Sequence, residues 1–310
     1  MQSAEKLPLV VIVGPTAVGK TDLAVQLAQQ LETEIISADS RQIYRKMDIG
    51  TAKPTKAQQA LVRHHLIDII DPEETYSLAV FQSQAWEIIG QLHNKGKVPL
   101  LVGGTGQYIR AVVQGWKPPE LKADQELRSK LEETAARDGV DGLLAQLQQK
   151  DPVSAERIDP RNVRRVIRAL EVVLQTGRPF SDQRLIEPPP YRVIQIGLNR
   201  PRGELYRRID QRIDLMIQAE LLEEVKAILQ DGCPEDVPSM SAIGYREMVA
   251  VLHGKISIEE AVVLMKRATR NYVRRQANWF SLRDAGIRWF NMQEDAFSQV
   301  AGFLKQELQN

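Results

Sequence analysis

The chain has 310 residues, of which 43% are hydrophobic and 26% are charged, and its formal net charge is +1. This composition is typical of a globular protein with a sizeable core, and the length predicts about two domains. One cysteine excludes an intrachain disulfide and, with only four histidines, argues against a structural zinc site, so we expect a reducing, cytoplasmic setting. The first apolar run, 7–13, is too short to span a membrane, and we expect neither a membrane span nor a signal peptide.

The first predicted element is an apolar strand, 9–13, that runs into a glycine-containing loop and then into a helix. The loop has the full phosphate-binding pattern, with Gly14, four intervening residues, and then Gly19, Lys20 and Thr21. Glycines let backbone N–H groups turn toward an oxyanion, the helix N-terminus adds positive potential, and Lys20 adds a point charge. Thr21 is placed to offer its hydroxyl to Mg²⁺. The pattern therefore predicts a phosphorylated ligand but does not specify ATP.

Apolar runs predict four further strands, at 33–37, 98–102, 192–198 and 287–290. Helical patterns separate the first three strands of the chain, which is the alternation of an α/β, doubly wound parallel sheet, whose ligands bind beyond the carboxyl ends of the strands. Asp39 follows the second strand, where its carboxylate either takes a proton from an attacking group or caps the next turn. Gly103 and Gly104 follow the third strand, where phosphate-loop hydrolases usually have a magnesium-binding Asp, so an ATPase or GTPase is disfavoured.

Two proline clusters, in 116–121 and 187–191, enclose segments with helical periodicity. We interpret them as the borders of an inserted all-helical domain. The predicted domains are a phosphate-loop core of residues 1–116 and 190–310 and an insert of residues 117–189.

The neutral net charge conceals two basic segments. Residues 161–212 contain twelve arginines and five acidic residues, and residues 264–283 contain six basic residues and no acid. This distribution suggests a surface for a polyanion. One predicted helix of the insert has Pro160 in its first turn and Gly177 at its end. Its arginines form either a solvated stripe or a phosphate-binding face, and the lack of interleaved acid favours phosphates. They are Arg161, Arg164, Arg165 and Arg168.

Six sequence blocks occur in order between residues 14 and 248. They are GPTAVGKT, SADSRQIYRKMDIGTAKP, HHLIDIIDPEETYS, VGGTGQYIRAVVQG, RNVRRVIRALEV and SAIGYREM. Together they resemble the tRNA dimethylallyltransferase family, whose members are also called tRNA isopentenyltransferases, and the similarity continues through TRNYVRRQANWF. Some eukaryotic relatives append a zinc finger, for which this chain lacks the cysteines, so the resemblance is to the bacterial form.

The resemblance implies a kinase-like fold and transfer of a dimethylallyl group from dimethylallyl diphosphate to N6 of the tRNA adenosine on the 3′ side of the anticodon, position 37. The products are N6-dimethylallyladenosine and diphosphate, so the loop binds the leaving group even though it looks like an ATP-binding motif. We expect Mg²⁺ as cofactor, bound by Thr21, and the anticodon stem-loop of tRNA as partner of a monomer. The diphosphate-binding residues implied are Gly14, Pro15, Thr16, Ala17, Val18, Gly19, Lys20, Thr21 and Arg212.

The resemblance also implies two catalytic residues. Asp39 matches the acidic residue of the family and is our general base, because adenine N6 is a poor nucleophile until its proton is removed. Thr105 matches a threonine that contacts the target nucleotide near N6. The implied tRNA-binding residues are Asp39, Ser40, Arg41, Gln42, Thr105, Arg128, Arg164, Arg165, Val166, Ile167, Arg168, Ala242, Ile243, Gly244, Tyr245, Arg246 and Glu247.

Three other functions stay open. A small-molecule phosphate-loop kinase would share the loop and an acceptor-binding Asp, but it would not need two basic segments. A free-adenylate isopentenyltransferase would share the chemistry and differ in its acceptor. A non-enzymatic RNA-binding switch protein would bind RNA without turnover.

Overall fold

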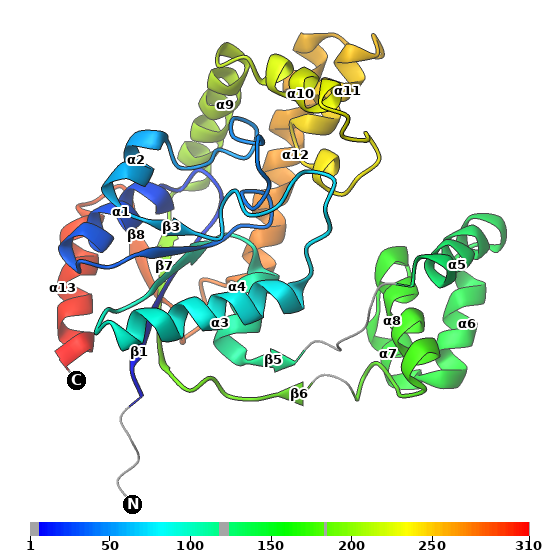
Figure 1. Ribbon diagram of the computed structural model, residues 1–310, viewed down its shortest axis with the longest axis horizontal. Helices are drawn as coiled ribbons and strands as arrows, with labels where there is room; N and C mark the ends of the chain where they lie inside the picture. The colour runs from blue at the N-terminus through cyan, green and yellow to red at the C-terminus, as the bar shows by residue number, and fades with distance from the viewer. Residues whose placement is uncertain (1–5, 118–123, 183–184, 310) are drawn as a thin grey trace, which may run out of the picture. The chain divides into compact units, whose positions relative to one another are not determined.

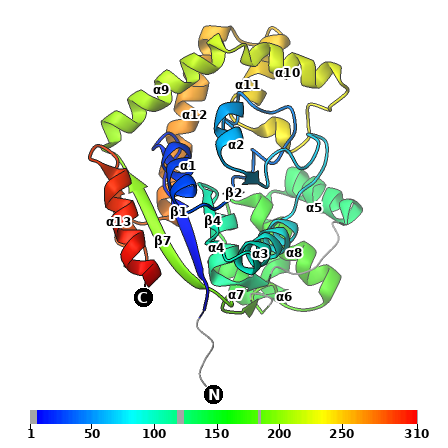
Figure 2. The same ribbon diagram turned by 60° about the vertical axis from the view of Figure 1, so that its left-hand side comes forward.

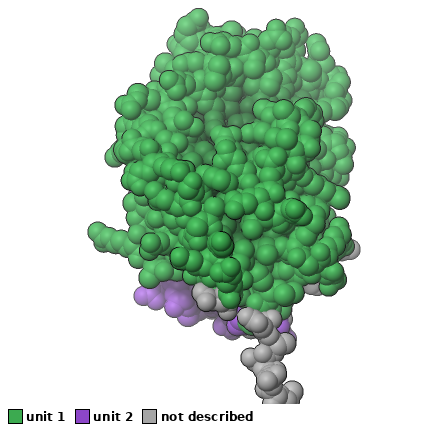
Figure 3. All heavy atoms as spheres, turned by 90° about the vertical axis from the view of Figure 1, so that its left-hand side faces the viewer, with its two compact units in different colours: residues 1–113, 189–310 green, residues 114–188 purple. Residues whose placement is uncertain are grey.

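The computed structural model describes residues 6–117, 124–182 and 185–309. The described chain forms two compact units, which are coloured separately in Figure 3. Unit 1 comprises Met1–Val113 and Pro189–Asn310, and unit 2 comprises Gln114–Pro188. Unit 2 is therefore an insertion in the chain of unit 1. The proline pair at 118–119 and Arg184, which entered the sequence-based predictions, lie outside the described residues.

Unit 1 is built on a six-stranded sheet in which all pairs are parallel (Figure 1). In spatial order its strands are β3 (His64–His65), β2 (Ile35–Ala38), β4 (Leu100–Gly103), β1 (Pro8–Val13), β7 (Arg192–Asn199) and β8 (Arg288–Asn291). The predicted doubly wound parallel sheet is confirmed. Five strands lie where the apolar runs predicted them, with bounds shifted by one or two residues, whereas two-residue β3 was too short to produce a periodic signal.

Helices cover both faces of this sheet. In unit 1 they are α1 (Lys20–Gln30), α2 (Lys56–Leu61), α3 (Leu78–Asn94), α4 (Gly106–Gln114), α9 (Arg202–Gln218), α10 (Leu221–Gln230), α11 (Tyr245–Leu252), α12 (Ile258–Trp279) and α13 (Ala296–Gln309). A 3-10 turn, η1 (Ser239–Ser241), precedes α11. None of the described helices combines the length and the apolar character needed to cross a membrane.

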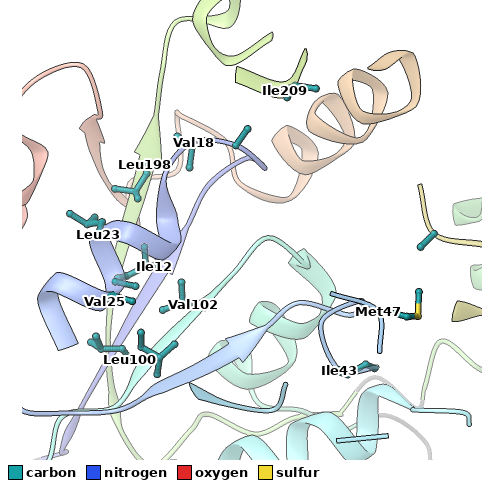
Figure 4. Packing of buried hydrophobic residues seen from close by; sticks show 14 of the residues in the cluster. Ile12, Val18, Leu23, Val25, Ile43, Met47, Leu100, Val102, Leu198 and Ile209 are labelled. Carbon is teal, nitrogen blue, oxygen red and sulfur yellow. The ribbon is translucent and has the colours of Figure 1, made fainter. Parts of the chain in front are cut away.

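The central strand β1 shows why its sequence is continuously apolar. Val10 and Ile12 belong to a core cluster with residues of α1, α9 and α13, part of which is drawn in Figure 4. Leu9, Val11 and Val13 belong to a second cluster with residues of α3 and α4. Successive side chains of a strand point to opposite faces, so a strand buried on both faces has no polar alternation.

Unit 2 has its own apolar core, to which Leu143, Leu147, Val166 and Leu170 contribute fully buried side chains. Its described helices are α5 (Gln125–Asp138), α6 (Val140–Lys150), α7 (Pro152–Arg157) and α8 (Val163–Thr176). The predicted all-helical insert also contains a short antiparallel ladder that the sequence did not predict. This ladder pairs β5 (Trp116–Lys117) with β6 (Leu185–Ile186).

Helix α8 ends where the sequence predicted and begins later. Gly177 adopts a left-handed conformation, φ 68°, at the C-cap, which glycine accommodates without a steric penalty. Asn162 is the N-cap, and its side chain accepts a hydrogen bond from the Arg165 N–H at 3.3 Å. The prediction that Arg161 lies on this helix is wrong, because Asp159 accepts the Arg161 N–H at 3.0 Å in the turn before it.

Candidate active site

Three neighbouring strands end at the same level of the sheet. Gly103 at the end of β4 pairs with Val13 of β1 on one side and with Ala38 of β2 on the other. A Cβ on Gly103 would lie 2.2 Å from the carbonyl oxygen of Ala38, so the strands approach this closely only because the residue is glycine. The residues that follow, among them Asp39, therefore emerge side by side at the carboxyl edge, where ligands of such sheets bind.

The phosphate loop follows β1 and is held from outside by arginines. Arg208 of α9 donates from Nε to the Ala17 carbonyl at 2.8 Å, and Arg200 donates from Nε to the Val18 carbonyl at 3.0 Å. A Cβ on Gly14, whose φ is +151°, would lie 2.6 Å from the backbone oxygen of Leu198. Two successive loop carbonyls, those of Ala17 and Val18, are thus each held by an arginine, which fixes the backbone of the loop.

Lys20 is a partly buried cation of the loop. Its Nζ donates to the carbonyl oxygens of Gly14 at 3.0 Å and Pro15 at 2.9 Å. Burial lowers the pKa of Lys20 to about 8, the charge of Asp39 acts in the opposite direction, and Arg212 lowers it further. A lysine in this environment gains from a nearby anion, because a negative charge replaces the hydration that burial removes.

Two cavities meet beside this loop. The smaller, of about 260 Å³, is lined by Lys20, Thr21 and Ser37 among others. The larger, of about 390 Å³, is lined by Arg246 and Tyr272 among others. Six residues line both, namely Thr16, Ala17, Asp39, Thr51, Ala52 and Arg212. Asp39 therefore lies on the wall that the two cavities share.

Asp39 caps a turn, which is one of the two roles that the sequence left open. Its Oδ1 accepts a hydrogen bond from the Arg41 N–H at 2.9 Å, which caps the turn after β2. Its Oδ2 has no hydrogen-bond partner among the residues that the structure describes. Thr105 Oγ1 accepts the N–H of Ser40 at 3.0 Å, so the two segments that carry the proposed catalytic residues are hydrogen-bonded to each other.

Arg212 of α9 faces the phosphate loop, with its guanidinium 3.5 Å from Thr16 Oγ1. Burial lowers the pKa of Arg212, and neighbouring Arg208 lowers it further, while Asp22 and Asp39 raise it. A guanidinium stays charged even when its pKa is depressed, and it suits an anion that has several oxygens. The predicted diphosphate-binding residues are thus brought together, although Arg212 is almost 200 positions from the loop in sequence.

Two residues of α12 belong to this site and were missed in the sequence analysis. Tyr272 hydrogen-bonds with Thr105, and burial raises the pKa of its hydroxyl to about 12, with the charge of Asp39 contributing. The buried amide of Gln276 accepts the Thr16 N–H at 2.9 Å. Their spacing of four residues was the only available signal, and it lay inside a segment that we had interpreted through its basic residues.

The residues expected to bind tRNA in unit 1 fall on different walls. Arg41 donates to the Pro238 carbonyl at 2.6 Å and lines the larger cavity, as do Ala242, Ile243 and Arg246. Gln42 lines the smaller cavity, where its amide donates to the Ala52 carbonyl at 3.2 Å. Ser40 also lines the larger cavity, which therefore collects most of these residues.

Three members of the 242–247 stretch are buried supports, which corrects the expectation that the whole stretch contacts RNA. Glu247 accepts the N–H of Gly244 at 2.7 Å and caps α11. Tyr245 is fully buried, and its hydroxyl donates to Glu224 Oε1 at 2.6 Å. Glu224 also accepts the N–H groups of Asp48 and Ile49, at 2.9 and 2.8 Å. These side chains hold the cavity wall and do not reach a ligand.

In unit 2, the expectation that the whole stretch 164–168 contacts tRNA is corrected in a similar way. Val166 and Ile167, expected in the tRNA-binding stretch, are buried in the apolar core of the unit, 0% and 2% exposed, which excludes side-chain contact with RNA. Arg164 and Arg165 are exposed. Arg128 and Arg168 flank the buried carboxylate of Glu171, at 3.8 and 3.4 Å.

Acids that lie outside each basic segment also partly neutralise it. In unit 2, Arg161 forms a two-point pair with Asp159. In unit 1, α9 and α12 lie side by side (Figure 2), and Lys266 pairs with Asp214 at 2.6 Å. Arg270 likewise pairs with Asp210, at 2.5 Å. The charge count along the sequence therefore overstated the free positive charge of both segments.

The oxygen donors in the smaller cavity suit Mg²⁺ bound together with a diphosphate. Among the described residues, no three His, Cys, Asp or Glu side chains are grouped to hold a metal ion. Mg²⁺ does not require such a group, because it keeps several waters and binds through one or two protein oxygens and substrate phosphates. Thr21 at the start of α1 lines this cavity, together with Ser37.

This fold and site define a phosphate-loop transferase in which a carboxylate separates the phosphate cavity from an acceptor cavity. A family model described as IPP transferase matches residues 42–283. The chain belongs to this family, the tRNA dimethylallyltransferases, which confirms the resemblance carried by the sequence blocks.

Two curated relatives and two solved structures illustrate the similarity. A tRNA dimethylallyltransferase of Roseiflexus sp. is 52% identical over 274 residues, 88% of this chain and 90% of that protein. One of Herpetosiphon aurantiacus is 50% identical over 98% of this chain and 96% of that protein.

The solved full-length tRNA isopentenylpyrophosphate transferase of Bacillus halodurans has a TM-score of 0.73 and 42% identity, covering 98% of this chain and 97% of that chain. A eukaryotic dimethylallyltransferase acting on tRNA has a TM-score of 0.80 and 26% identity, covering 97% of this chain and 80% of that one.

Proposed function

We propose that this protein transfers a dimethylallyl group from dimethylallyl diphosphate to N6 of the adenosine at position 37 of tRNA. The observation that carries the proposal is the position of Asp39 on the wall shared by two cavities. One cavity contains the phosphate loop, and the other opens beside Thr105 and the turn after β2. The arrangement supports a role for Asp39 as the proton acceptor between a leaving group and a nucleophile.

The reaction exchanges one bond for another. The N6 nitrogen attacks the allylic carbon, the bond from that carbon to the diphosphate oxygen breaks, and its electron pair leaves with diphosphate. Asp39 accepts the proton that N6 loses, which is the role of a positioned general base. Thr105, hydrogen-bonded to Ser40 and Tyr272, offers a hydroxyl that orients the base.

The phosphate loop stabilises the negative charge that the diphosphate gathers. Lys20 and Arg212 are in place before the reaction, so they need no reorganisation as charge develops. Mg²⁺, held by Thr21 and by the substrate, supplies further positive charge to the same oxygens when it is bound. Gly103 and Gly104, and no carboxylate, stand at the end of β4. Their presence agrees with a phosphate loop that binds a leaving group.

We propose that RNA meets the acceptor cavity and unit 2. The target base must leave its stack to reach Asp39, which costs a few kcal/mol and is easier from an unpaired anticodon loop. Arg41 and Arg246 line the acceptor cavity, and Arg164 and Arg165 are exposed on unit 2. Their guanidinium groups suit backbone phosphates and unstacked bases.

The test is a transfer assay with the purified protein. We expect an anticodon stem-loop RNA incubated with dimethylallyl diphosphate and Mg²⁺ to yield N6-dimethylallyladenosine, detected by mass spectrometry of its nucleosides. Matched reactions replace the donor with ATP or the acceptor with AMP. Phosphoryl transfer from ATP would establish the kinase, prenylated AMP without prenylated RNA would establish the free-adenylate enzyme, and RNA binding without any product would establish the switch protein.

A further inference from the structure

Gln276 of α12 is a buried polar residue that joins two parts of the site. Its side chain is 4% exposed. Oε1 accepts the Thr16 N–H of the phosphate loop at 2.9 Å, and Nε2 donates to the Gly104 carbonyl at 3.0 Å. One amide therefore spans from the donor-binding loop to the residue before Thr105.

The surrounding backbone is shaped to admit this amide. A Cβ on Gly104 would lie 2.3 Å from Gln276 Nε2, so any other residue at this position would displace the amide from its present place. One turn further along α12, a Cβ on Gly106 would lie 2.2 Å from Trp279. The helix thus approaches the Gly104–Gly106 segment at two successive turns, and both approaches depend on the absence of a side chain.

The donor and the acceptor of the amide point in defined directions, because each has a partner of the opposite kind. The N–H of Thr16 can only donate and the carbonyl of Gly104 can only accept, so the amide has one satisfactory orientation. One turn earlier on the same face, Tyr272 hydrogen-bonds with Thr105. Helix α12 therefore holds the segment around Thr105 at two points and the phosphate loop at one.

We infer that Gln276 is a positioning residue that keeps the phosphate loop in register with the Thr105 segment, so that the allylic carbon and N6 meet in line. The inference rests on the proposed function and adds to it a residue that contacts neither substrate. Thr16 lines both cavities, and Gln276 fixes its backbone, so a shift at Gln276 changes the spacing between leaving group and acceptor. Reaction rates are sensitive to misplacements of about 1 Å.

The test variant is Gln276→Met, which has similar length and cannot form either hydrogen bond. We expect kcat at saturating dimethylallyl diphosphate and stem-loop RNA to fall about ten- to hundredfold. We expect the affinity for inorganic diphosphate, measured by calorimetry without RNA, to fall about three- to tenfold, as for one modest hydrogen bond. The diphosphate measurement stays informative even if wild-type protein transfers no prenyl group, which separates this inference from the proposed function.

The matched control is Gln82→Met on α3. Gln82 is equally buried, 4% exposed, and its Nε2 donates to the Ala111 carbonyl at 2.6 Å, but it lines neither cavity. We expect this variant to lose a similar amount of thermal stability while kcat and diphosphate affinity stay within about twofold of wild type. A kcat loss as large as that of Gln276→Met would overturn the inference, because it would then follow from stability alone.

A second variant, Gln276→Glu, keeps an acceptor for the Thr16 N–H and loses the donor for the Gly104 carbonyl. We expect at least a tenfold loss of kcat at saturating substrates, about the lower limit given above. It decides the question if Gln276→Met does not fold. Wild-type kcat in either variant, provided that it folds, would overturn the role of Gln276. Wild-type diphosphate affinity in Gln276→Met would overturn it as well.

Discussion

Thr105 Oγ1 accepts the backbone N–H of Ser40 at 3.0 Å, which ties the residue after Asp39 to the turn that follows β4. The two segments are 65 residues apart in sequence and meet because β2 and β4 are neighbours in the sheet. The bond fixes the backbone on one side of Asp39, and the carboxylate itself fixes the other side by accepting the Arg41 N–H. The carboxylate of Asp39 is therefore held in place by the protein alone.

Removing the carboxylate of Asp39 should slow transfer without preventing RNA binding. We expect Asp39→Asn to lower the single-turnover rate about 10²- to 10⁴-fold, the usual contribution of a general base. The amide keeps an acceptor for the Arg41 N–H and cannot take the proton, so the turn should persist. RNA affinity, measured by filter binding, is the control. A normal rate in this variant would remove Asp39 from the mechanism.

Arg212 should serve the diphosphate through its charge. We expect Arg212→Ala to weaken binding of inorganic diphosphate about ten- to a hundredfold, the effect of losing one charge-assisted contact. Arg207→Ala is the matched control, because Arg207 is exposed on the same helix and lines neither cavity. Isothermal calorimetry measures both variants. Equal losses in the two would show that α9 acts through its overall charge rather than through Arg212.

The hydroxyl of Thr21 should set the requirement for Mg²⁺. We expect chelation of divalent cations to stop transfer, and Thr21→Ala to need more Mg²⁺ than wild type to reach half of its maximal rate, because one protein oxygen is lost. Thr21→Ser keeps the hydroxyl and should behave like wild type. Rates measured over a Mg²⁺ titration compare the three proteins. Identical Mg²⁺ dependence in Thr21→Ala would contradict the assignment of Thr21 as a metal ligand.

Arg164 offers the cleanest test of RNA binding by unit 2. We expect Arg164→Ala to weaken binding of the stem-loop and to reduce the salt slope by about 0.7 to 0.9, the value for one neutralised phosphate. Arg161→Ala is the control with a smaller expected change, because Asp159 already pairs with Arg161. Arg168→Ala is less clean, since it removes a partner of buried Glu171. An unchanged salt slope of binding in Arg164→Ala would indicate that this face of the helix is an ordinary solvated surface.

Tyr245 should contribute to stability and not to chemistry. Burial, followed by the charge of Glu224, raises the pKa of the Tyr245 hydroxyl, so this group donates its hydrogen bond at every physiological pH. We expect Tyr245→Phe to lower the free energy of unfolding by about 1.5 to 3 kcal/mol, because a bond to a charged acceptor is lost. Urea unfolding measures the loss. A change in kcat at temperatures where the variant is folded would contradict a purely supporting role.

The elements that the sequence predicted best are those specified by local pattern. Strand β1, the phosphate loop and the start of α1 follow from an apolar run, a glycine spacing and a lysine–threonine pair that are contiguous in the chain. Asp39 was placed at a strand end by the same kind of argument, and the order β2, β4, β1 then puts it one strand away from the loop. What the family blocks added was the nature of the phosphorylated ligand and its acceptor.

Long-range contacts decided what local pattern could not. Arg212 and Gln276 reach the phosphate loop from helices far along the chain, and neither has a periodic signal that points to it. The charge of the basic segments depended on acids of other segments, such as Asp214 beside Lys266.

The sequence by itself determined the parallel sheet, the phosphate loop and the family, because contiguous residues encode strand burial and anion binding. Only the tertiary structure decided which side chains share the site and which support it. Tyr245 and Ile167 occupy motif positions like those of Arg246 and Arg164, yet the first two are buried. The reason is physical. The exposure of side chains, their ion pairs and the distances between elements arise from packing across the sheet. The spacing of residues along any one element does not specify that packing.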